Sequence, residues 1–361
     1  CKYPIDDNER VAILKDGEWR ATAPGRADHR YISFHLWEAY SPMSSLTEIV
    51  ANFLAANKAK KAGDPEEMHT WQNTTLGEAI APDKGDGVEP HSLLARREPR
   101  DVEVPMGACY LTAGVDTQDD RLEVLVLGWG PHEECWLVDR LTFNGNTEDA
   151  EPWDELTELL DREFEHASGH RLMISAACVD SGGHRTANVY DYARRMAARR
   201  VFAIIGREGN RPIVSSPSPR KWGKGKRKVP LYTIGVDSAK AIWASRLKLT
   251  DKGPGYVHLP IEDWCDEEFA LQMTSEVLVK KWDKGVPRDV WKKLRARNEA
   301  WDCAVYGLGA LRLQHPNLVE VARLLAAEPV RNESEVPAPV AAAAPKQKWI
   351  PRKSGWLRRG R

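Results

Sequence analysis

The sequence predicts an α/β domain over residues 107–315, with a mixed sheet flanked by helices. Three β-rich runs come first: YLTAGVD (110–116), RLEVLVLGWG (121–130) and ECWLVDRLTF (134–143). The turns between them are too short for a crossover connection, which predicts an antiparallel meander. Helical and apolar stretches alternate after the meander, a pattern typical of parallel strands with helical crossovers.

The later elements of this domain can be assigned in order. Residues 152–167 predict an amphipathic helix with Pro152 near its start, where proline is tolerated. Residues 172–180 are apolar almost throughout, as in a strand that is buried on both faces and parallel to its neighbour. A helix over 184–200 and a strand over 201–206 follow. The order β-β-β-α-β-α-β is that of the ribonuclease H-like fold, although other α/β folds share parts of it.

Segments of different composition flank this domain. Residues 1–62 mix loop and helix, and the spacing of apolar residues predicts a helix over 46–62. Residues 63–106 are polar, as in a linker. Residues 316–361 include the Pro/Ala-rich stretch EVPAPVAAAAPKQK, which is typical of an extended or disordered tail. Because the chain begins with Cys1 rather than Met, we expect a fragment of a longer protein.

Composition excludes some classes of protein. Hydrophobic residues make up 42% and charged residues 29% of the 361 residues, which allows a sizeable core. No apolar run approaches the ~20 residues of a membrane-spanning helix, so we expect no membrane partner. The six cysteines lack C-x-x-C spacing, and several lie in apolar runs, which favours free thiols in a reducing, cytosolic compartment.

The net charge of −1 conceals two basic segments. Residues 217–230 contain no acid and six basic residues: Arg220, Lys221, Lys224, Lys226, Arg227 and Lys228. Residues 345–361 contain seven basic residues and no acid. Such blocks can be merely solvated, but both contain tryptophan, which favours contact with nucleic acid or a partner. We expect the first segment to form a hairpin against DNA phosphates, flanked by strands over 211–215 and 229–235.

Two aspartates end apolar strands of similar sequence. Asp116 closes the phrase AGVD, and Asp180 closes ACVD. In the predicted fold the first and fourth strands are parallel neighbours, about 4.8 Å apart, so both carboxyl groups lie at the same end of the sheet. Two such side chains can bind one divalent cation. Each aspartate can alternatively belong to a turn or cap the next helix.

A third carboxyl group lies on a later helix, expected over residues 296–313. Asp302 follows Glu299 by three residues, so both lie on one helical face, and the helix is strongly apolar beyond Asp302. A carboxylate at the buried edge of such a helix requires a partner. That partner is either a metal ion or an arginine such as Arg295 or Arg297.

Three carboxylates suit two hard cations. Oxygen ligands favour Mg²⁺ or Mn²⁺, and two such ions about 3.5–4 Å apart can activate water and stabilise a leaving oxygen. The sequence therefore predicts phosphodiester hydrolysis. The candidate catalytic and metal-binding residues are Asp116, Asp180 and Asp302. Lys240 is a candidate phosphate contact, and His184 and Glu299 are candidates for positioning the metal ligands.

Several short sequence segments resemble segments of the large terminase subunit of lambda-like tailed bacteriophages. They are LTAGVDTQDDRLEV, VDSGGH, IGVDSAK, PGYVHLP and NEAWDCAVY, with FHLW and NTTLGE upstream. The resemblance extends from residue 1 to about residue 315. It implies a DNA-packaging motor protein whose ribonuclease H-like endonuclease cuts concatemeric double-stranded DNA. By motif, it implies that Asp116, Asp180 and Asp302 are the metal-binding acids.

The resemblance also has implications for the N-terminal segment, the binding partners and the location of the protein. Residues 1–62 resemble only the trailing part of the ATPase motor region, and this sequence contains no G-x-x-x-x-G-K-[ST] motif. The implied partners are double-stranded DNA, a small terminase subunit that directs cutting, and the portal or prohead, on which the basic C-terminal tail would dock. The implied location is the cytoplasm of the host cell.

Two other hypotheses fit the same residues. A DNA-clamping and portal-docking module would carry the acids without cutting DNA by itself. Another ribonuclease H-like enzyme, such as a transposase or junction resolvase, would share the carboxylates but has no use for the upstream FHLW region. Manganese-dependent nicking of a plasmid, lost on Asp180→Ala, separates the nuclease from the clamp. Joined strands among the products identify a transposase.

Overall fold

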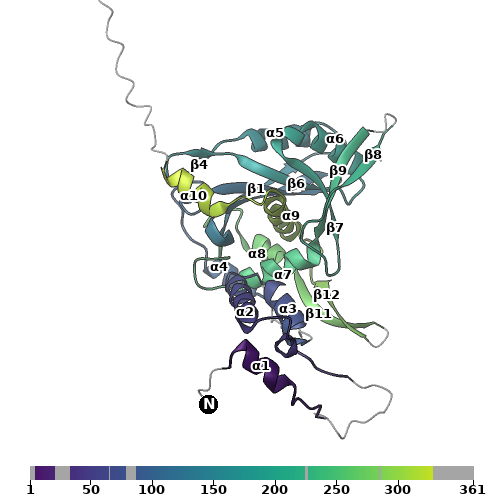
Figure 1. Cartoon of the computed structure of the whole chain (residues 1–361). Helices are drawn as coiled ribbons and strands as arrows, with labels where there is room; N and C mark the ends of the chain where they lie inside the picture. The colour runs from purple at the N-terminus through teal and green to yellow at the C-terminus, as the bar shows by residue number, and fades with distance from the viewer. Residues whose placement is uncertain are drawn as a thin grey trace, which may run out of the picture. The chain divides into compact units, whose positions relative to one another are not determined.

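The computed structural model describes residues 5–20, 33–64, 66–78, 87–223, 227–283 and 286–327. The chain divides into two compact units, Cys1–Glu328 and Pro329–Arg361. All the helices and strands below belong to the first unit, which is built around an eight-stranded mixed sheet (Figure 1).

The sheet combines the predicted meander with the predicted parallel strands. Its order is β10-β3-β2-β1-β6-β7-β9-β8. The bounds are β1 (Tyr110–Thr117), β2 (Arg121–Trp129), β3 (Cys135–Asn144), β6 (Ile174–Asp180), β7 (Val201–Arg207), β8 (Ser218–Trp222), β9 (Arg227–Gly235) and β10 (Val257–His258). Strands β1, β2 and β3 pair antiparallel, whereas β1, β6, β7 and β9 pair parallel. The expected parallel contact between residues 110–116 and 172–180 is therefore confirmed.

Successive side chains of the central strands enter two different cores, because side chains alternate between the faces of a sheet. In β2, Leu125, Leu127 and Trp129 belong to one core, and Val124 and Val126 belong to the other. The strand is therefore buried on both faces, and only Arg121 at its start is partly exposed.

Helices cover both faces of the sheet (Figure 1). On the Val124 side lie α5 (Glu151–Asp161) and α6 (Thr186–Arg195). On the Leu125 side lie α7 (Val236–Arg246), α8 (Glu267–Met273), α9 (Glu299–Gln314) and the start of α10 (Leu318–Ala327). Helix α9 is buried continuously from Cys303 to Leu311. The helices expected over 152–167, 184–200 and 296–313 are confirmed, all three with shorter bounds.

The N-terminal residues add further helices to the same unit. They are α1 (Asp7–Leu14), the 3-10 helix η2 (Glu38–Tyr40), α2 (Leu46–Lys61), α3 (Glu66–Trp71), the π-helical turn η3 (Gln72–Leu76) and α4 (Pro90–Ala95). Helix α2 confirms the helix expected over 46–62, and the Ser45 hydroxyl caps it by accepting from the Glu48 N–H at 3.1 Å. The stretch expected as a linker thus contains α3, η3 and α4. None of the described helices combines the length and apolarity needed to cross a membrane.

The strands near the basic segment differ from expectation. Residues 211–215 form no strand, and their contact with the sheet is an isolated bridge between Val214 and Ile234. The strand that pairs with β9 is β8, which lies inside the basic segment itself. Pairing with β9 therefore selects a strand that local sequence preference does not indicate.

The sequence also does not predict several short elements. The largest is an antiparallel hairpin of β11 (Glu276–Asp283) and β12 (Val286–Lys293), which forms a two-stranded sheet. A smaller hairpin joins β4 (Phe164–Glu165) to β5 (Arg171–Leu172), and two 3-10 turns are η4 (Pro131–Glu133) and η5 (Ala197–Arg199).

Candidate active site

Asp116 and Asp180 end neighbouring strands on the face of the sheet that α9 covers. The Thr112 hydroxyl donates to an α9 carbonyl at 3.0 Å, and Asp116 lies four residues farther along β1, on the same face. Val115 of β1 pairs directly with Val179 of β6. Each aspartate is the next residue after this pair, so both carboxyl groups lie at the same end of the sheet and on the same face.

Helix α9 approaches β1 so closely that glycine is required at the contact. A Cβ atom on Gly114 would lie 1.8 Å from the Cys303 carbonyl oxygen, and one on Gly307 would lie 2.5 Å from a Leu127 methyl carbon. Asp302 directly precedes Cys303 in the first turn of α9. This close contact therefore holds the third carboxyl group near the end of β1.

Burial raises the pKa of all three carboxyl groups. The pKa of Asp116 is raised to about 7, mainly by burial and then by the negative charge of Asp302, with a smaller effect of Asp180. Burial also raises the pKa of Asp180 to about 6. The pKa of Asp302 is raised to about 6, again mainly by burial, although the nearby Lys240 opposes this shift. The three groups therefore share one electrostatic environment.

Each of these carboxyl groups accepts a hydrogen bond from a neutral donor. Gln118 donates to Asp116 at 2.5 Å, the Gly182 N–H to Asp180 at 3.2 Å, and Asn298 to Asp302 at 2.8 Å. Within the described ranges, none of the three forms an ion pair with lysine or arginine. Their negative charges are thus held in place but not neutralised.

The neighbouring carboxylates, in contrast, have basic partners. Glu123 accepts from Arg121 at 2.9 Å, and Arg121 also donates to Glu299 at 2.9 Å. Glu276 binds Lys240 at 2.8 Å. Among the described acids of this site, the three aspartates are therefore the ones that form no ion pair with lysine or arginine.

The arginines considered as partners of Asp302 lie elsewhere. Arg297 is 3.5 Å from carboxylate oxygens of Glu123, Glu268 and Glu299, and Arg295 is exposed. An arginine bridge therefore does not account for the burial of Asp302.

The chemistry of the donor set suits a hard cation. Three carboxyl groups from two strand ends and one helix offer oxygen atoms, the ligands that Mg²⁺ and Mn²⁺ prefer. A bound cation would also offset the burial and mutual repulsion that raise their pKa values. Among the described residues, no three His, Cys, Asp or Glu side chains are already gathered at metal-binding distance. Their convergence on a metal ion stays a prediction.

The residues proposed to assist the aspartates have different surroundings. Lys240 is not an exposed helix lysine, because both oxygens of Glu276 bind it at 2.8 and 2.9 Å. Glu299 is buried and paired with an arginine of β2. The His184 side chain is 89% exposed and lies 3.5 Å from Asp119 in the β1–β2 turn. Of these three, Lys240 and Glu299 act electrostatically on the aspartates.

The basic segment forms one edge of the sheet. Arg220 and Lys221 are exposed on β8, the last strand, and Lys228 is exposed on β9. The Trp222 ring anchors β8 by packing edge-on against Tyr190 of α6, with ring centroids 5.5 Å apart. Lys224, Lys226 and the Arg227 side chain lie outside the described part of the chain. A hairpin is present, but its first strand is β8, inside the basic segment, and not the expected strand over 211–215, while β9 begins in the segment and extends beyond it to Gly235.

The sequence did not predict the residues that donate hydrogen bonds to the aspartates. Gln118 follows Asp116 by two residues and Asn298 precedes Asp302 by four, so closeness to a candidate acid was the available signal. Lys293 of β12, whose charge lowers the pKa of Asp302, could not be found this way, because it comes from a hairpin that the sequence does not predict.

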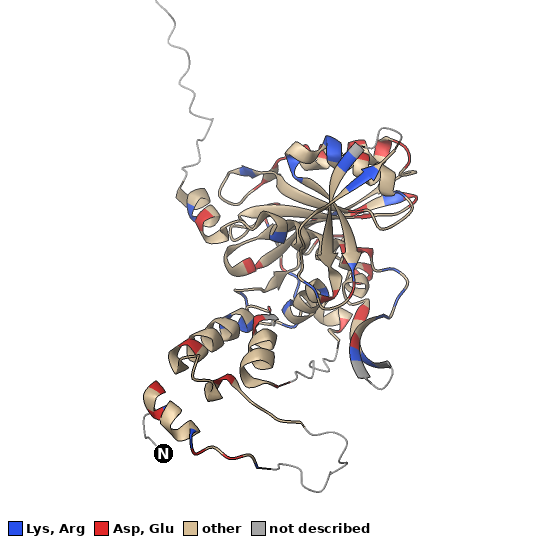
Figure 2. Ribbon diagram, turned by 45° about the vertical axis from the view of Figure 1, so that its right-hand side comes forward, with Lys and Arg blue, Asp and Glu red and all other residues tan. Residues whose placement is uncertain are grey.

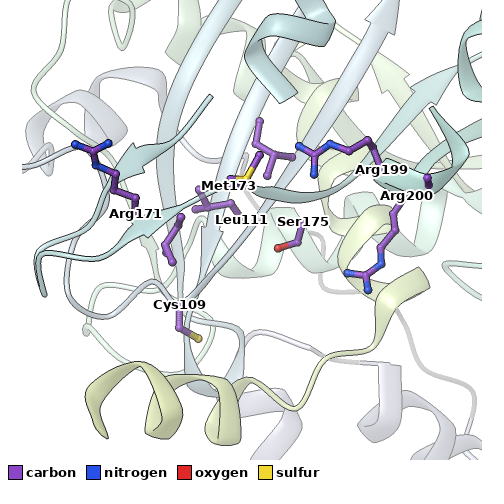
Figure 3. Close-up of a pocket in the computed structure, with 10 residues that line it drawn as sticks. Cys109, Leu111, Arg171, Met173, Ser175, Arg199 and Arg200 are labelled. Atoms are coloured by element: carbon purple, nitrogen blue, oxygen red, sulfur yellow. The ribbon is translucent and has the colours of Figure 1, made fainter. Parts of the chain in front are cut away.

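A cavity of about 390 Å³ lies at the other end of the same strands (Figure 3). Its lining includes Leu111 near the start of β1, Ser175 near the start of β6, and three arginines, Arg171, Arg199 and Arg200. Because Asp116 and Asp180 end these two strands, the cavity is separate from the carboxyl groups.

Comparison with known proteins identifies the family. Residues 31–322 match the family model described as "Terminase large subunit gpA, endonuclease domain". The chain is 36% identical over 288 residues to the terminase large subunit of Escherichia phage lambda, and 34% identical over 291 residues to that of Enterobacteria phage P21. These alignments cover 78% and 79% of this chain but only 44% of each relative. The chain therefore belongs to the terminase large-subunit gpA family, and its match is to the endonuclease domain of that family.

Proposed function

We propose that this chain is a metal-dependent endonuclease that cuts concatemeric double-stranded DNA during phage genome packaging. Family membership supports a DNA-packaging nuclease. The observation that carries the chemistry is the group formed by the buried Asp116 and the half-buried Asp180 and Asp302. They share one charge environment, and none of them forms an ion pair with lysine or arginine among the described residues.

The three aspartates would hold two Mg²⁺ or Mn²⁺ ions. Such ions, when bound, supply activation of a water molecule and stabilisation of the leaving oxygen at a phosphodiester. The chain itself orients the ligands: the Gln118 amide holds the carboxyl group of Asp116, and the Asn298 amide holds that of Asp302. Because the raised pKa values leave these groups partly protonated near neutral pH, cations and protons compete for the same oxygens.

We infer that the sheet has the ribonuclease H-like fold. The strand order β3-β2-β1-β6-β7, in which an antiparallel meander adjoins parallel strands, supports this inference. The position of Asp116 and Asp180 at the ends of the adjacent strands β1 and β6 agrees with it.

The β8–β9 edge is the proposed DNA contact. Exposed lysine and arginine side chains on the outermost strand of a sheet can reach phosphate oxygens without reading sequence. The residues assigned to this contact are Arg220, Lys221, Lys224, Lys226, Arg227 and Lys228. Lys240, held by Glu276, would act by lowering the pKa of Asp302 rather than as an isolated charge on a phosphate.

The other assignments concern partners and the segments that flank the sheet. A small terminase subunit would direct where the DNA is cut, and the basic tail, which lies outside the described residues, would dock on the portal or prohead. Residues 1–62 would be the trailing part of the motor region. The site of action would be the cytoplasm of the host cell.

The test is cleavage of supercoiled plasmid by the purified chain with Mn²⁺. We expect nicked and linear products, and a loss of at least about 100-fold in rate for Asp180→Asn and Asp302→Asn, which each remove a ligand. Asp154→Asn, an exposed aspartate of α5, is the matched control and should cut at the wild-type rate. Nicking that survives the Asp180 and Asp302 substitutions would refute the proposed site.

The alternative is a DNA-clamping and portal-docking module that carries the three aspartates without cutting DNA by itself. In that case the wild-type chain binds plasmid DNA but leaves it intact in Mn²⁺. The same experiment therefore separates the two functions.

A further inference from the structure

Two lysines act on the charge of Asp302, and they have different surroundings. Burial raises the pKa of this carboxyl group, and the charges of Lys240 and Lys293 oppose the shift. The Lys240 side chain is 11% exposed, and both oxygens of Glu276 bind its ammonium group at 2.8 and 2.9 Å. Lys293, the last residue of β12, is exposed and forms no ion pair among the described residues. Lys293 therefore keeps a positive charge that a ligand can reach.

Lys293 belongs to the hairpin of β11 and β12, along which Figure 2 shows basic and acidic residues. The two strands pair in antiparallel register, with Lys293 directly opposite Glu276. Opposite residues share a face of the hairpin, and so do residues two apart in one strand. Lys293, Glu276 and Trp291 therefore lie on the same face.

That face of the hairpin is turned toward the first turn of α9. Trp291 packs against Trp301 of α9, with ring centroids 6.2 Å apart. Glu276 accepts from the Asn298 amide at 3.2 Å, and the same amide nitrogen donates to Asp302 at 2.8 Å. Two separate contacts thus hold this face next to the third carboxyl group of the candidate active site.

The acid opposite Lys293 is already occupied. The Glu276 side chain is 6% exposed, and it accepts two hydrogen bonds from Lys240 and one from Asn298. The charge of Glu276 is therefore balanced by Lys240. An ammonium group has three N–H donors and no acceptor. The ammonium group of Lys293 is consequently suited to an anion that approaches Asp302 from solvent.

We propose that Lys293 is a catalytic residue, which donates to a non-bridging oxygen of the phosphate that is cut and stabilises the negative charge that develops there. This inference rests on the proposed function and names a residue that contacts its substrate. In the reaction a water oxygen bonds to phosphorus and the bond from phosphorus to the leaving oxygen breaks, whereas Lys293 keeps its proton. The phosphate contact that the sequence predicts for Lys240 belongs instead to this exposed lysine.

The test compares Lys293→Gln with Lys292→Gln in the full chain. The two lysines are adjacent and exposed, and both changes remove one positive charge, but the side chains lie on opposite faces of the hairpin. The nicking rate of supercoiled plasmid is measured with protein in excess and saturating Mn²⁺. We expect Lys293→Gln to lower this rate by about 100-fold, the usual loss for one such donor. Lys292→Gln should cut at the wild-type rate, and Lys293→Arg, which keeps the charge, at about a tenth of that rate or faster.

A second measurement separates contact with the phosphate from an effect through Asp302. Loss of the Lys293 charge raises the pKa of Asp302, so a purely indirect role would weaken metal binding through protonation of that carboxyl group. Such a defect disappears in excess Mn²⁺ at about pH 8.5, where Asp302 is ionised in both proteins and lysine is still protonated. The loss of a phosphate contact persists under these conditions. We therefore expect Lys293→Gln to remain about 100-fold slower than the wild type there.

Equal rates for Lys293→Gln and Lys292→Gln would overturn the proposal, as would a deficit that vanishes at the higher pH. Thermal midpoints equal to that of the wild type establish that the variants are folded. If Lys293→Gln does not fold, Lys293→Met, which keeps an unbranched apolar stem without the charge, gives the same comparison. A wild-type chain that never cuts refutes the nuclease, and the role of Lys293 with it. A wild-type chain that cuts no faster than Lys293→Gln refutes the role of Lys293 alone.

Discussion

Asp116 is the most strongly perturbed of the three aspartates. It is 6% exposed, and burial together with the charge of Asp302 raises its pKa to about 7. A carboxyl group whose pKa is higher in the folded than in the unfolded protein takes up protons on folding. At high pH the three ionised groups therefore oppose folding unless a cation binds them.

We predict that the metal-free protein becomes less stable as the pH rises from about 5 to about 8. Between the usual Asp value of 3.8 and the raised values of about 6 and about 7, the folded state binds more protons than the unfolded state. The free energy of unfolding consequently falls as the pH rises. Urea denaturation at a series of pH values measures it. Stability that increases over this range contradicts the account.

Asp116→Asn is the matched variant for this prediction. The amide cannot ionise, so the stability of the variant should depend less on pH. At about pH 8 its free energy of unfolding should exceed that of the wild type by a few kcal/mol at most, since one pKa unit is about 1.4 kcal/mol. A variant that is less stable than the wild type there would show that the Asp116 charge is already neutralised in the folded protein.

At the residue scale, the sequence predicted the acids but not their partners. Asp116 and Asp180 stand out because each ends an apolar strand, and Asp302 because it interrupts a buried helix. The pairing of Lys240 with Glu276 joins positions 36 residues apart. Such pairs depend on tertiary packing, which strand and helix periodicity does not report.

The contact between α9 and β1 is the element-scale feature that positions Asp302. We predict that Gly114→Ala destabilises the protein by roughly 2–4 kcal/mol, because its Cβ would lie 1.8 Å from the Cys303 carbonyl oxygen and force α9 away from β1. Plasmid nicking should fall as well, since Asp302 moves with the helix. Thermal denaturation and the nicking assay measure the two effects.

Gly183→Ala is the control for the added methyl group. Its Cβ would meet only the Thr117 carbonyl oxygen, at 3.9 Å, which is an ordinary contact. The thermal midpoint of this variant should equal that of the wild type. If Gly114→Ala is equally harmless, the close approach of α9 does not hold the third aspartate.

Strands were predictable from the sequence where burial requires a continuous run of apolar residues. The meander and the strands over 172–180 and 201–206 are buried and read as apolar runs. The β11–β12 hairpin was missed because exposed basic residues interrupt its apolar ones, and both of its faces carry charge. Strand β8 was misplaced because pairing with β9, rather than its own sequence SPRKW, makes it a strand.

At the scale of the whole molecule, one ion-pair network joins distant parts of the chain. Glu133 of η4 binds Arg246 of α7 and Arg312 of α9, and Arg312 also lies 3.3 Å from Asp64, which follows α2. Burial alone would raise the pKa of Glu133, but the two arginines hold it below its usual value. The network thus links the N-terminal helices to the helices that cover the sheet.

We predict that Glu133→Gln lowers the free energy of unfolding by about 2–3 kcal/mol, because it leaves the buried Arg246 guanidinium without a charged partner. Urea denaturation measures the loss. Glu320→Gln breaks the exposed pair with Arg323 and should leave the free energy of unfolding nearly unchanged, because water screens such a pair. Equal effects of the two substitutions would show that the network contributes no more than a surface pair.

The family was predictable from short phrases spread along the chain, and the match over residues 31–322 confirms it. The match begins well upstream of residue 107, where the sequence predicts the nuclease domain to start. The structure places helices in the stretch between them and assigns residues 1–328 to one compact unit. Polar composition alone could not show that residues 63–106 contain helices, since α4 packs through few side chains such as Leu93.

The most direct measurement of the central claim is diffraction from crystals soaked in Mn²⁺, with anomalous scattering to locate the ions. The account predicts two manganese peaks, about 3.5–4 Å apart, among Asp116, Asp180 and Asp302. Their carboxylate oxygens should lie about 2.0–2.2 Å from the ions, close to the distances of hard-cation sites. Manganese bound only elsewhere, with the three aspartates free of metal, would contradict it.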